Sequence, residues 1–342
     1  MPEVNQRIKI AVDAMGGDYA PGEIIKGVVY AAEKEYVEIA LVGPMDILEE
    51  ELAKHDSSQN LPIRRIQADQ FIEEGESPAL AVHSKPNASI TMAATLLKIG
   101  EVDALVSAGP TGATLASVVQ LLGTLPGIER PAVCVPLLGL APNTVLVDGG
   151  ANIDCKPQHL LSFAVIGSVY AKNLLNVSNP KIALLNIGTE EGKGGRLIRE
   201  SYPLLRNSNL DFIGNIEGNE VLSGRANVIV CDGVIGNIVM KLYESLGYYI
   251  VRWLKDKLGE SLLDNPVKKL LDQMSSFSKI TGNKSGGGDL LWGVNGVVQV
   301  MHGNSRARQV SNAIARARDA VKTNMVEALK SELSKIGIKR GA

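Results

Sequence analysis

The chain has 342 residues, of which 45% are hydrophobic and 21% charged, a composition typical of an ordinary globular protein. Its formal net charge of −2 argues against nucleic-acid binding, which needs an excess of Lys and Arg. The 3 cysteines lack CxxC or Cys/His spacing, no apolar run is long enough to span a membrane, and the N-terminus does not resemble a signal peptide, so we expect a cytoplasmic protein with reduced thiols.

Short apolar runs rich in β-branched residues alternate with longer helical patterns through most of the chain. The expected strands are 8–13, 39–42, 63–66, 104–107, 133–137, 144–147, 182–187 and 228–231. The expected helices are 21–34, 89–99, 111–122, 157–173 and 194–206. This alternation predicts βαβ units around a largely parallel sheet with helices on both faces. The strands are solidly apolar because parallel strands are buried on both faces.

The stretch 234–280 interrupts the alternation and predicts a helical hairpin with a turn near Asp264-Asn265-Pro266. Its second helix carries one apolar stripe, at Leu263, Val267, Leu270, Leu271, Met274 and Phe277. Such a stripe packs into its own domain, pairs with its twin in a homodimer or lies on a membrane, and the sequence leaves these three alternatives open. The stretch 305–335, rich in Ala, Arg and Lys, predicts a closing surface helix.

Five glycine-rich junctions each follow an expected strand. They are 13–18, 107–113, 148–157, 186–195 and 231–237, and polar turns at 295–296 and 302–305 add to them. In open α/β sheets, ligands bind at the carboxyl ends of the strands, where loops and helix N-termini converge. We therefore expect these junctions to meet at one rim of the sheet and to hold an anion.

Each junction also has a structural interpretation, as a tight turn, a capped helix or a solvated loop. At 107–113, a strand runs into a helix whose free N–H groups favour an anion, and Ser107 and Thr111 add hydroxyl donors. The junction 186–195 superficially resembles a nucleotide-binding P-loop. However, only three residues separate Gly188 from Gly192, and Gly194 stands where Ser or Thr is needed, which excludes nucleotide hydrolysis. Lys193 remains a candidate for binding an anionic substrate.

The sequence also lacks several catalytic motifs. There is no G-x-S-x-G, H-E-x-x-H, EF-hand loop or G-x-G-x-x-G, so the hydrolase, zinc-protease and classical dinucleotide-binding classes lose their usual support. Helix N-termini, lysines, hydroxyls and carboxylates favour phosphate or phosphoryl chemistry. The residues alone thus predict an α/β enzyme that handles a small anion.

The same junctions closely resemble those of the bacterial acyl-[acyl-carrier-protein]–phosphate acyltransferases of phospholipid synthesis. The matching segments are IAVDAMGGDYAP, DALVSAGPTGA, GANIDCKP, NIGTEEGKG, NIEGNE, VCDGVIGN and NGVVQVMHGNS, in order from residue 10 to about residue 314. The resemblance implies a Rossmann-like three-layer α/β/α fold, similar to isocitrate dehydrogenase-type enzymes and phosphate acetyltransferases. It further implies one α/β catalytic domain over 1–342, a homodimer, and a projecting hairpin at 234–280 for dimer or membrane contact.

Several positions depart from the family's pattern. Pro110 stands where the family usually has Asn, and His83 where it usually has Arg. Asp289 and Trp292 replace smaller or apolar residues. None of these departures changes the type of reaction that the resemblance implies.

The reaction implied by the resemblance is attack of a phosphate oxygen on the acyl thioester of acyl carrier protein, which needs neither a Ser or Cys nucleophile nor a cofactor or metal. Phosphate holding is assigned to Lys85, Lys193 and the helix start with Thr111. Oxyanion stabilisation is assigned to backbone N–H groups with Asn152 and Lys156. Either His302 or Asp232 supplies the proton for the departing thiolate. The other expected substrate-binding residues are Asp13, Gly16, Gly17, Ser107, Gly109, Gly112, Asp154 and Asn237.

Three other functions remain open. They are a phosphate acetyltransferase-like enzyme that uses coenzyme A thioesters, a metal-dependent decarboxylating dehydrogenase of similar fold, and a non-enzymatic lipid-surface adaptor. The expected partners are acyl carrier protein, inorganic phosphate and a second copy of the chain. Peripheral contact with a membrane or with a downstream membrane acyltransferase is a further expectation, and nucleic acid is not expected.

Overall fold

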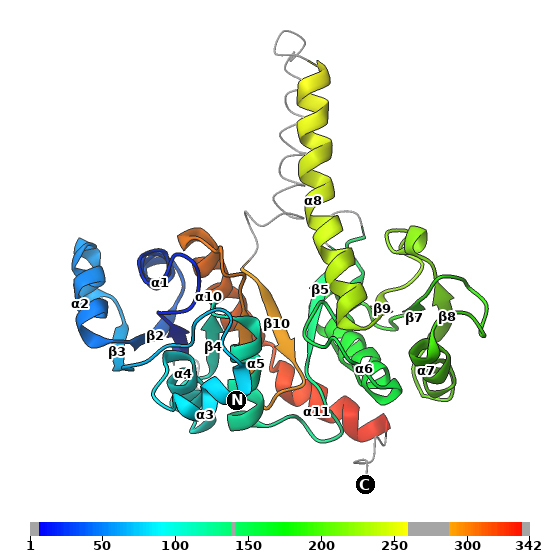
Figure 1. Ribbon diagram of the computed structural model, residues 1–342, viewed down its shortest axis with the longest axis horizontal. Helices are drawn as coiled ribbons and strands as arrows, with labels where there is room; N and C mark the ends of the chain where they lie inside the picture. The colour runs from blue at the N-terminus through cyan, green and yellow to red at the C-terminus, as the bar shows by residue number, and fades with distance from the viewer. Residues whose placement is uncertain (1–6, 138–140, 259–286, 337–342) are drawn as a thin grey trace. The chain divides into compact units, whose positions relative to one another are not determined.

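The computed structural model describes residues 7–137, 141–258 and 287–336 (Figure 1). The chain divides into two compact units, unit 1 with Met1–Pro131 and Gly287–Ala342, and unit 2 with Ala132–Gly286. Each unit has its own sheet of mostly parallel strands with flanking helices, which confirms the α/β fold. The expectation that 1–342 acts as one catalytic domain stays a prediction.

Unit 1 contains β1 (Ile8–Asp13), α1 (Gly22–Lys34), β2 (Val37–Gly43), α2 (Met45–Ala53), a 3-10 turn (Asp56–Asn60), β3 (Ile63–Gln67), α3 (Pro78–Ser84), α4 (Ser89–Lys98), β4 (Ala104–Ser107), α5 (Thr111–Leu122), β10 (Asp289–Trp292), β11 (Val297–Val300), α10 (Ala307–Lys322) and α11 (Met325–Ile336). Its strand order is β3-β2-β1-β4-β11-β10. All neighbouring strands are parallel except β10 and β11. The central strands are mostly apolar and largely buried, because helices cover both faces.

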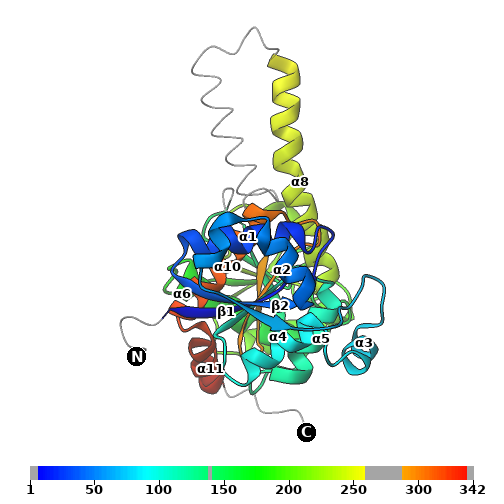
Figure 2. The ribbon, with the colours of Figure 1, turned by 90° about the vertical axis from the view of Figure 1, so that its left-hand side faces the viewer.

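Helices cover the two faces of the unit 1 sheet in pairs. Figure 2 shows α1 and α10 on one side of β1 and β2, and α4 and α5 on the other. The backbones of α1 and α10 approach closely at Gly27, where an added Cβ would lie 2.5 Å from the Ala307 carbonyl oxygen and 2.5 Å from Val310 Cβ. Glycine at position 27 therefore sets the distance between these two helices.

Unit 2 contains β5 (Ala132–Pro136), β6 (Val145–Val147), α6 (Pro157–Leu174), β7 (Ile182–Leu185), α7 (Arg196–Arg206), β8 (Phe212–Ile216), a 3-10 turn (Gly218–Glu220), β9 (Val228–Val230) and α8 (Gly233–Leu258). Its strand order is β5-β6-β9-β7-β8. Only the pair β5 and β6 is antiparallel.

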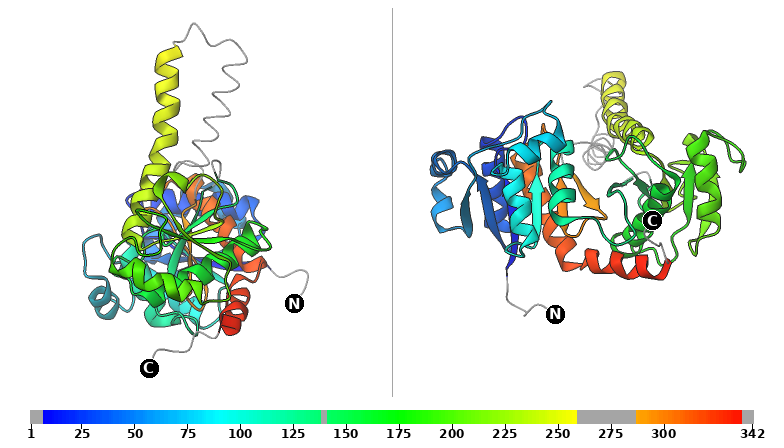
Figure 3. Two further views of the ribbon diagram at one scale, coloured as in Figure 1. Left: turned by 90° about the vertical axis from the view of Figure 1, so that its right-hand side faces the viewer. Right: turned by 60° about the horizontal axis from the view of Figure 1, so that its bottom comes forward.

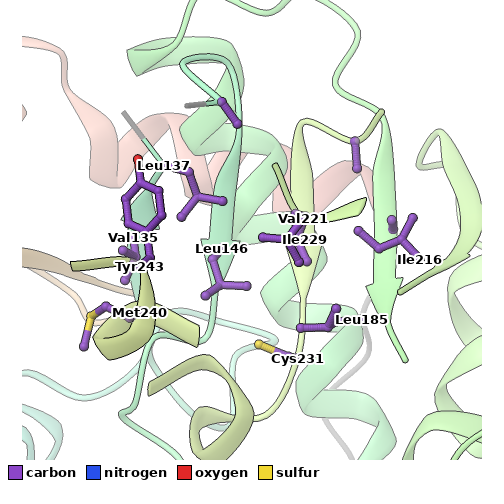
Figure 4. Close-up of a cluster of buried hydrophobic side chains, with 13 residues drawn as sticks. Val135, Leu137, Leu146, Leu185, Ile216, Val221, Ile229, Cys231, Met240 and Tyr243 are labelled. Atoms are coloured by element: carbon purple, nitrogen blue, oxygen red, sulfur yellow. The ribbon is translucent and has the colours of Figure 1, made fainter. Parts of the chain in front are cut away.

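The base of α8 is anchored in the core of unit 2. Met240 and Tyr243 are buried in a cluster with side chains from β5, β6, β7, β8 and β9 (Figure 4). Beyond this base, α8 projects away from the sheet of its own unit (Figure 3). Large apolar side chains three or four residues apart are exposed along it, at Ile235, Ile238, Leu242, Leu246, Tyr249 and Trp253. We call these six residues the apolar face of α8.

The structure differs from the sequence-based expectations in several elements. The expectations missed β8, β10, β11, α2 and α3. The closing helix expected at 305–335 is two helices, because the chain turns at Asn324, whose φ is 52°. It is also not a simple surface helix, since one side of α10 is buried at Val310, Ala313, Ile314 and Ala317.

The expected helical hairpin is described only in part. Its first helix is α8, whereas the second helix, with its apolar stripe and the turn at Asp264-Asn265-Pro266, lies outside the described residues. Among the helices that the structure describes, none is both long enough and apolar enough to cross a membrane.

The contact at Gly27 gives a test of the unit 1 packing. We expect Gly27→Ala to lower the free energy of unfolding by about 1–3 kcal/mol, because the added methyl group forces α1 away from α10. Gly22→Ala, in the same helix, is the matched control, since its Cβ would meet only Glu51 Oε2 at 3.7 Å. Urea unfolding of both variants measures the difference, and equal stabilities would contradict the close packing of the two helices.

Candidate functional site

In the unit 1 sheet, the strand order reverses between β1 and β4, and polar side chains stand at the carboxyl ends of these two strands. The chain places β2 and β3 on one side of β1 and then β4 on the other side. Ligands of open α/β sheets bind outside the carboxyl ends of the strands at such a reversal. Asp13 and Ser107 are the last residues of β1 and β4, and Ser107 Oγ donates a 2.8 Å hydrogen bond to Asp13 Oδ2.

Backbone groups of the two following loops join this buried pair. The Met15 N–H donates to Asp13 Oδ1 at 3.2 Å, and the Gly109 N–H donates to Ser107 Oγ at 3.0 Å. Gly16 lies directly against the second loop, since an added Cβ would be 2.5 Å from the Gly109 nitrogen. Asp13 is only 3% exposed, and this burial raises its pKa above the ordinary value.

A third loop, after β11, joins the same rim. The Asp18 N–H donates to the Gly303 carbonyl at 2.8 Å, and the Met301 N–H donates to the Ser107 carbonyl at 2.8 Å. His302 is half-buried between these two bonded positions. The structure therefore brings together, within unit 1, the expected site residues of these loops. They are Asp13, Gly16, Gly17, Ser107, Gly109 and His302.

The start of α5 has the form expected for an anion site. Thr111 and Gly112 are exposed at the first turn, and the Thr114 N–H donates to the Pro110 carbonyl at 3.0 Å as the first bond of the helix. The N–H groups of 111–113 therefore have no partner within the helix. The Gly109 N–H is already bonded to Ser107, so the N–H groups that could bind an anion here are those of 111–113.

Lys85 lies between α3 and α4, and α3 packs against the start of α5, since an added Cβ on Gly112 would lie 2.9 Å from Pro78. Its ammonium forms a 2.6 Å ion pair with Glu76 and donates to the Phe71 carbonyl at 3.1 Å. The ion pair lowers the pKa of Glu76. Lys85 must release Glu76 before it can hold a phosphate, and that role stays a prediction. His83 is exposed on α3.

In unit 2, three of the expected junctions follow adjacent parallel strands. The strands β6, β9 and β7 are neighbours, and their loops 148–156, 231–237 and 186–195 leave from the same edge of the sheet. The strand order reverses between β7 and β9, because β8 lies on the far side of β7. This edge is therefore the expected ligand site of unit 2.

Asp148 organises the first of these loops, and the sequence analysis did not single it out. Its Oδ1 accepts the N–H groups of Val133 at 2.9 Å, Gly150 at 3.3 Å and Ala151 at 3.1 Å. Its Oδ2 accepts the backbone N–H of Asn152 at 2.7 Å and the Asn152 side-chain amide at 2.8 Å. Burial raises the pKa of Asp148, and these hydrogen bonds oppose the rise. The carboxyl group thus fixes the loop from inside.

Asn152 consequently faces inward in this structure. It is 6% exposed, and its amide donates to Asp148, so its expected role as an oxyanion donor stays a prediction. The backbone carbonyl oxygen of Asn152 accepts the Gly233 N–H at 2.8 Å, and this bond joins the loop to the start of α8. The two loops touch through their backbones, since a Cβ on Gly236 would lie 1.8 Å from the Asp148 carbonyl oxygen.

The remaining expected residues of this edge divide into capping and exposed groups. Asp232 caps α8, because its Oδ1 accepts the N–H groups of Val234 and Ile235, both at 2.9 Å. Asn237 is exposed and lies beside Gly150, whose added Cβ would be 3.3 Å from Asn237 Cβ. Asp154 and Lys156 are exposed just before α6. Their roles stay predictions.

Lys193 is exposed in a turn of the loop after β7. Its ammonium lies 3.9 Å from Glu190 Oε1, and its side chain is 53% exposed. This long contact is the one ion pair that the structure describes for Lys193. Lys193 can therefore receive an anion without first breaking a tight ion pair.

The two cysteines near this edge are poor nucleophiles. Burial and the nearby Asp148 carboxylate raise the pKa of Cys155 to about 11. The same two causes raise the pKa of Cys231 well above its ordinary value. Since the thiolate is the reactive form, neither thiol is activated at neutral pH.

The arrangement can be compared with known proteins. The model of one protein family, described as fatty acid synthesis protein, matches residues 8–328. The chain belongs to this family. A phosphate acyltransferase from Desulforamulus reducens is 41% identical over 328 residues, which cover 95% of this chain and 97% of that protein. A phosphate acyltransferase from Desulforudis audaxviator is 43% identical over 325 residues, 93% of this chain and 94% of that protein. The resemblance stated from the motifs is thus confirmed, and so is the expected class of enzyme, an acyltransferase.

Solved structures support the fold. A phosphotransacetylase from Streptococcus pyogenes superposes with a TM-score of 0.64 at 20% identity, covering 92% of this chain and 94% of that one. A 4-hydroxythreonine-4-phosphate dehydrogenase from Klebsiella pneumoniae gives a TM-score of 0.54 at 15% identity, covering 92% of this chain and all of that one. At these identities the likeness concerns the fold alone.

Sequence reasoning also missed two asparagines. Asn186 closes β7 and Asn215 lies in β8, and both donate side-chain hydrogen bonds to the Lys193 loop. Their positions gave a usable signal, because each stands in or at the carboxyl end of a strand. Nothing in the local sequence, however, distinguishes an asparagine that faces a neighbouring loop from one that faces solvent.

The burial of Asp13 predicts how stability depends on pH. In the folded protein Asp13 keeps its proton at pH values where the unfolded chain, with a pKa of about 3.9, has lost it. This group therefore makes the free energy of unfolding fall as pH rises from about 4 through the raised pKa. We expect Asp13→Asn to remove that fall, so that the stability of the variant relative to wild type increases as the pH rises from about 4 through the raised pKa. Urea unfolding at several pH values measures it, and parallel pH profiles would show that Asp13 is not perturbed.

Proposed function

We propose that this chain transfers a fatty acyl group from acyl carrier protein to inorganic phosphate and forms an acyl phosphate for phospholipid synthesis. Family membership supports this function, as does the name phosphate acyltransferase carried by relatives that match along nearly their whole length. The observation that carries the proposal is the position of Lys193. Its exposed ammonium lies in the loop that follows β7, beside the reversal of strand order in unit 2.

In the proposed reaction, an oxygen of hydrogen phosphate attacks the thioester carbonyl of the acyl carrier protein. A C–O bond forms, the carbonyl oxygen becomes negatively charged, and the C–S bond then breaks. The proton of hydrogen phosphate is transferred to the departing thiolate, so that the products are acyl phosphate and the free carrier thiol. Phosphate is itself the nucleophile, which agrees with the unreactive Cys155 and Cys231.

The protein's tasks are to hold the phosphate, to stabilise the oxyanion and to move the proton. We assign phosphate holding to Lys193, and oxyanion stabilisation to the exposed Lys156 and to Asn152. Preorganised donors of this kind accelerate acyl transfer because they face charge that develops only in the transition state. Asp232 and His302 remain the two candidates for the proton step. Asp232 is already tied to the α8 N-terminus through Oδ1.

We further propose that the protein works as a cytoplasmic homodimer that touches the membrane peripherally. The apolar face of α8 supports an additional contact, because its side chains are strongly exposed, Leu242 by 64% and Trp253 by 59%. Exposed apolar patches of this kind mark protein or membrane contacts.

Lys193 provides the most direct mutational test. We expect Lys193→Met to lower kcat/KM for acyl-phosphate formation by about 100- to 1000-fold, the typical effect of losing one preorganised donor. The fold stays intact because the side chain is exposed. Lys181→Met is the matched control, since Lys181 is an exposed lysine at the opposite end of the same strand. Near-normal turnover of Lys193→Met would remove Lys193 from the site.

The choice of acyl donor separates the proposed function from its rivals. Purified protein is given phosphate with either acyl carrier protein or coenzyme A thioesters, and acyl phosphate is trapped with hydroxylamine. We expect faster trapping with acyl carrier protein, with one thiol released for each acyl phosphate. Faster reaction with coenzyme A thioesters would instead indicate a phosphate acetyltransferase-like enzyme. Reduction of NAD would indicate a dehydrogenase, and vesicle binding without turnover an adaptor.

A further inference from the structure

The turn that carries Lys193 is held by side chains from two different strands. The Lys193 N–H donates to the Glu190 carbonyl at 3.1 Å and closes the turn. The Asn215 amide, from β8, donates to the same Glu190 carbonyl at 2.8 Å. The Asn186 amide, at the end of β7, donates to the Lys193 carbonyl at 3.1 Å. Both ends of the turn are therefore fastened to the sheet by asparagine amides.

These bonds act on the backbone and leave the ammonium of Lys193 unrestrained. The one ion pair described for that ammonium is the long contact with Glu190 at 3.9 Å. The turn therefore fixes the position of the Lys193 backbone, from which the side chain extends. Glycine at position 194 permits this arrangement, because an added Cβ would lie 2.4 Å from Asn186 Oδ1 and would push the asparagine away.

The hydrogen bond from Asn215 to the turn is accompanied by a cost in stability, because Asn215 is buried. Asn215 is 2% exposed, and its Oδ1 has no hydrogen-bond partner among the residues that the structure describes. A buried, unsatisfied oxygen lowers the free energy of unfolding, and an apolar side chain in a strand would avoid that cost. The chain nevertheless has an asparagine at position 215. The one hydrogen bond described for its side chain is the bond to the Glu190 carbonyl in the Lys193 turn.

We propose that Asn186 and Asn215 are positioning residues that aim Lys193 at the phosphate group of the substrate. This inference rests on the proposed function, since it assigns Lys193 to phosphate. The two asparagines touch no substrate. They act through the carbonyls of Glu190 and Lys193, and they keep the turn in one place so that the ammonium is preorganised for the anion.

The test measures the affinity of the full-length protein for inorganic phosphate by calorimetric titration, so that the readout does not depend on turnover. Asn215→Val removes the amide and the unpaired oxygen without adding charge. Asn186→Asp removes the donor to Lys193 but keeps an oxygen for the Ile187 N–H, which donates to Asn186 Oδ1 at 2.8 Å. We expect each variant to bind phosphate about 5- to 10-fold more weakly, the equivalent of one lost hydrogen bond.

Asn227 offers a matched control in the same unit. Its Oδ1 accepts the Lys181 N–H at 3.0 Å and its amide donates to the Asn143 carbonyl at 3.0 Å, at the amino ends of β7 and β9. Asn227→Asp thus makes the same chemical change as Asn186→Asp at the opposite edge of the sheet. We expect it to affect thermal stability to a similar degree and to leave the affinity for phosphate unchanged.

A double-mutant cycle with Lys193→Met shows whether Asn215 acts through Lys193. If it does, Asn215→Val has no further effect on phosphate affinity once Lys193 has been replaced. The inference would be overturned if Asn215→Val weakened phosphate binding equally with and without Lys193. It would also be overturned if the Asn227→Asp control weakened phosphate binding as much as Asn186→Asp does, or if the wild-type protein did not bind phosphate. Failure of the proposed function is distinguishable, because wild-type protein would then bind phosphate in a Lys193-dependent manner but form no acyl phosphate.

Discussion

Direct backbone contact between loops that follow neighbouring strands is the constraint on which the carboxyl edges of both sheets depend. In unit 1, the loop after β1 meets the loop after β4 at Gly16 and Gly109, where an added Cβ on Gly16 would lie 2.5 Å from the Gly109 nitrogen. In unit 2, the start of α8 meets the loop after β6 at Gly236 and Asp148 in the same way. Because these contacts leave no room for side chains, the backbones of the loops lie directly against each other at the carboxyl edge of each sheet.

Both units add a buried carboxyl group to this arrangement. Asp13 and Asp148 are placed where burial raises their pKa, and hydrogen bonds from nearby donors stabilise them there. Their role follows from this burial, since a carboxyl group enclosed by backbone donors fixes a loop and has little access to substrate. Lys193 and the first turn of α5 are instead exposed at the carboxyl edges of the two sheets, and we propose that such exposed groups meet the anion. The chain thus separates the groups that hold the loops from the groups that we propose to bind the anion.

Much of the fold could be predicted from the sequence. The strands β1 and β4 and the helix α5 have the expected bounds, because each is an apolar run with a glycine or polar turn at its end. The strands β10 and β11 were missed because β11 pairs with β4, almost two hundred residues earlier, and no local pattern reports such a pairing. The junctions were also predictable, since loops follow strands. The direction of each polar side chain was not, and Asn152 and Asp232 form internal hydrogen bonds that depend on tertiary contacts.

The central claim is that the carboxyl edge of the unit 2 sheet holds inorganic phosphate through the turn that carries Lys193. A crystal structure of the protein grown with phosphate tests it most directly, with the Lys193→Met variant in the same crystal form as a reference. We expect a phosphate oxygen about 2.7–2.9 Å from Lys193 Nζ in the wild-type protein, and no phosphate at that position in the variant. Phosphate bound only at a place remote from Lys193, and equally in both proteins, would contradict it.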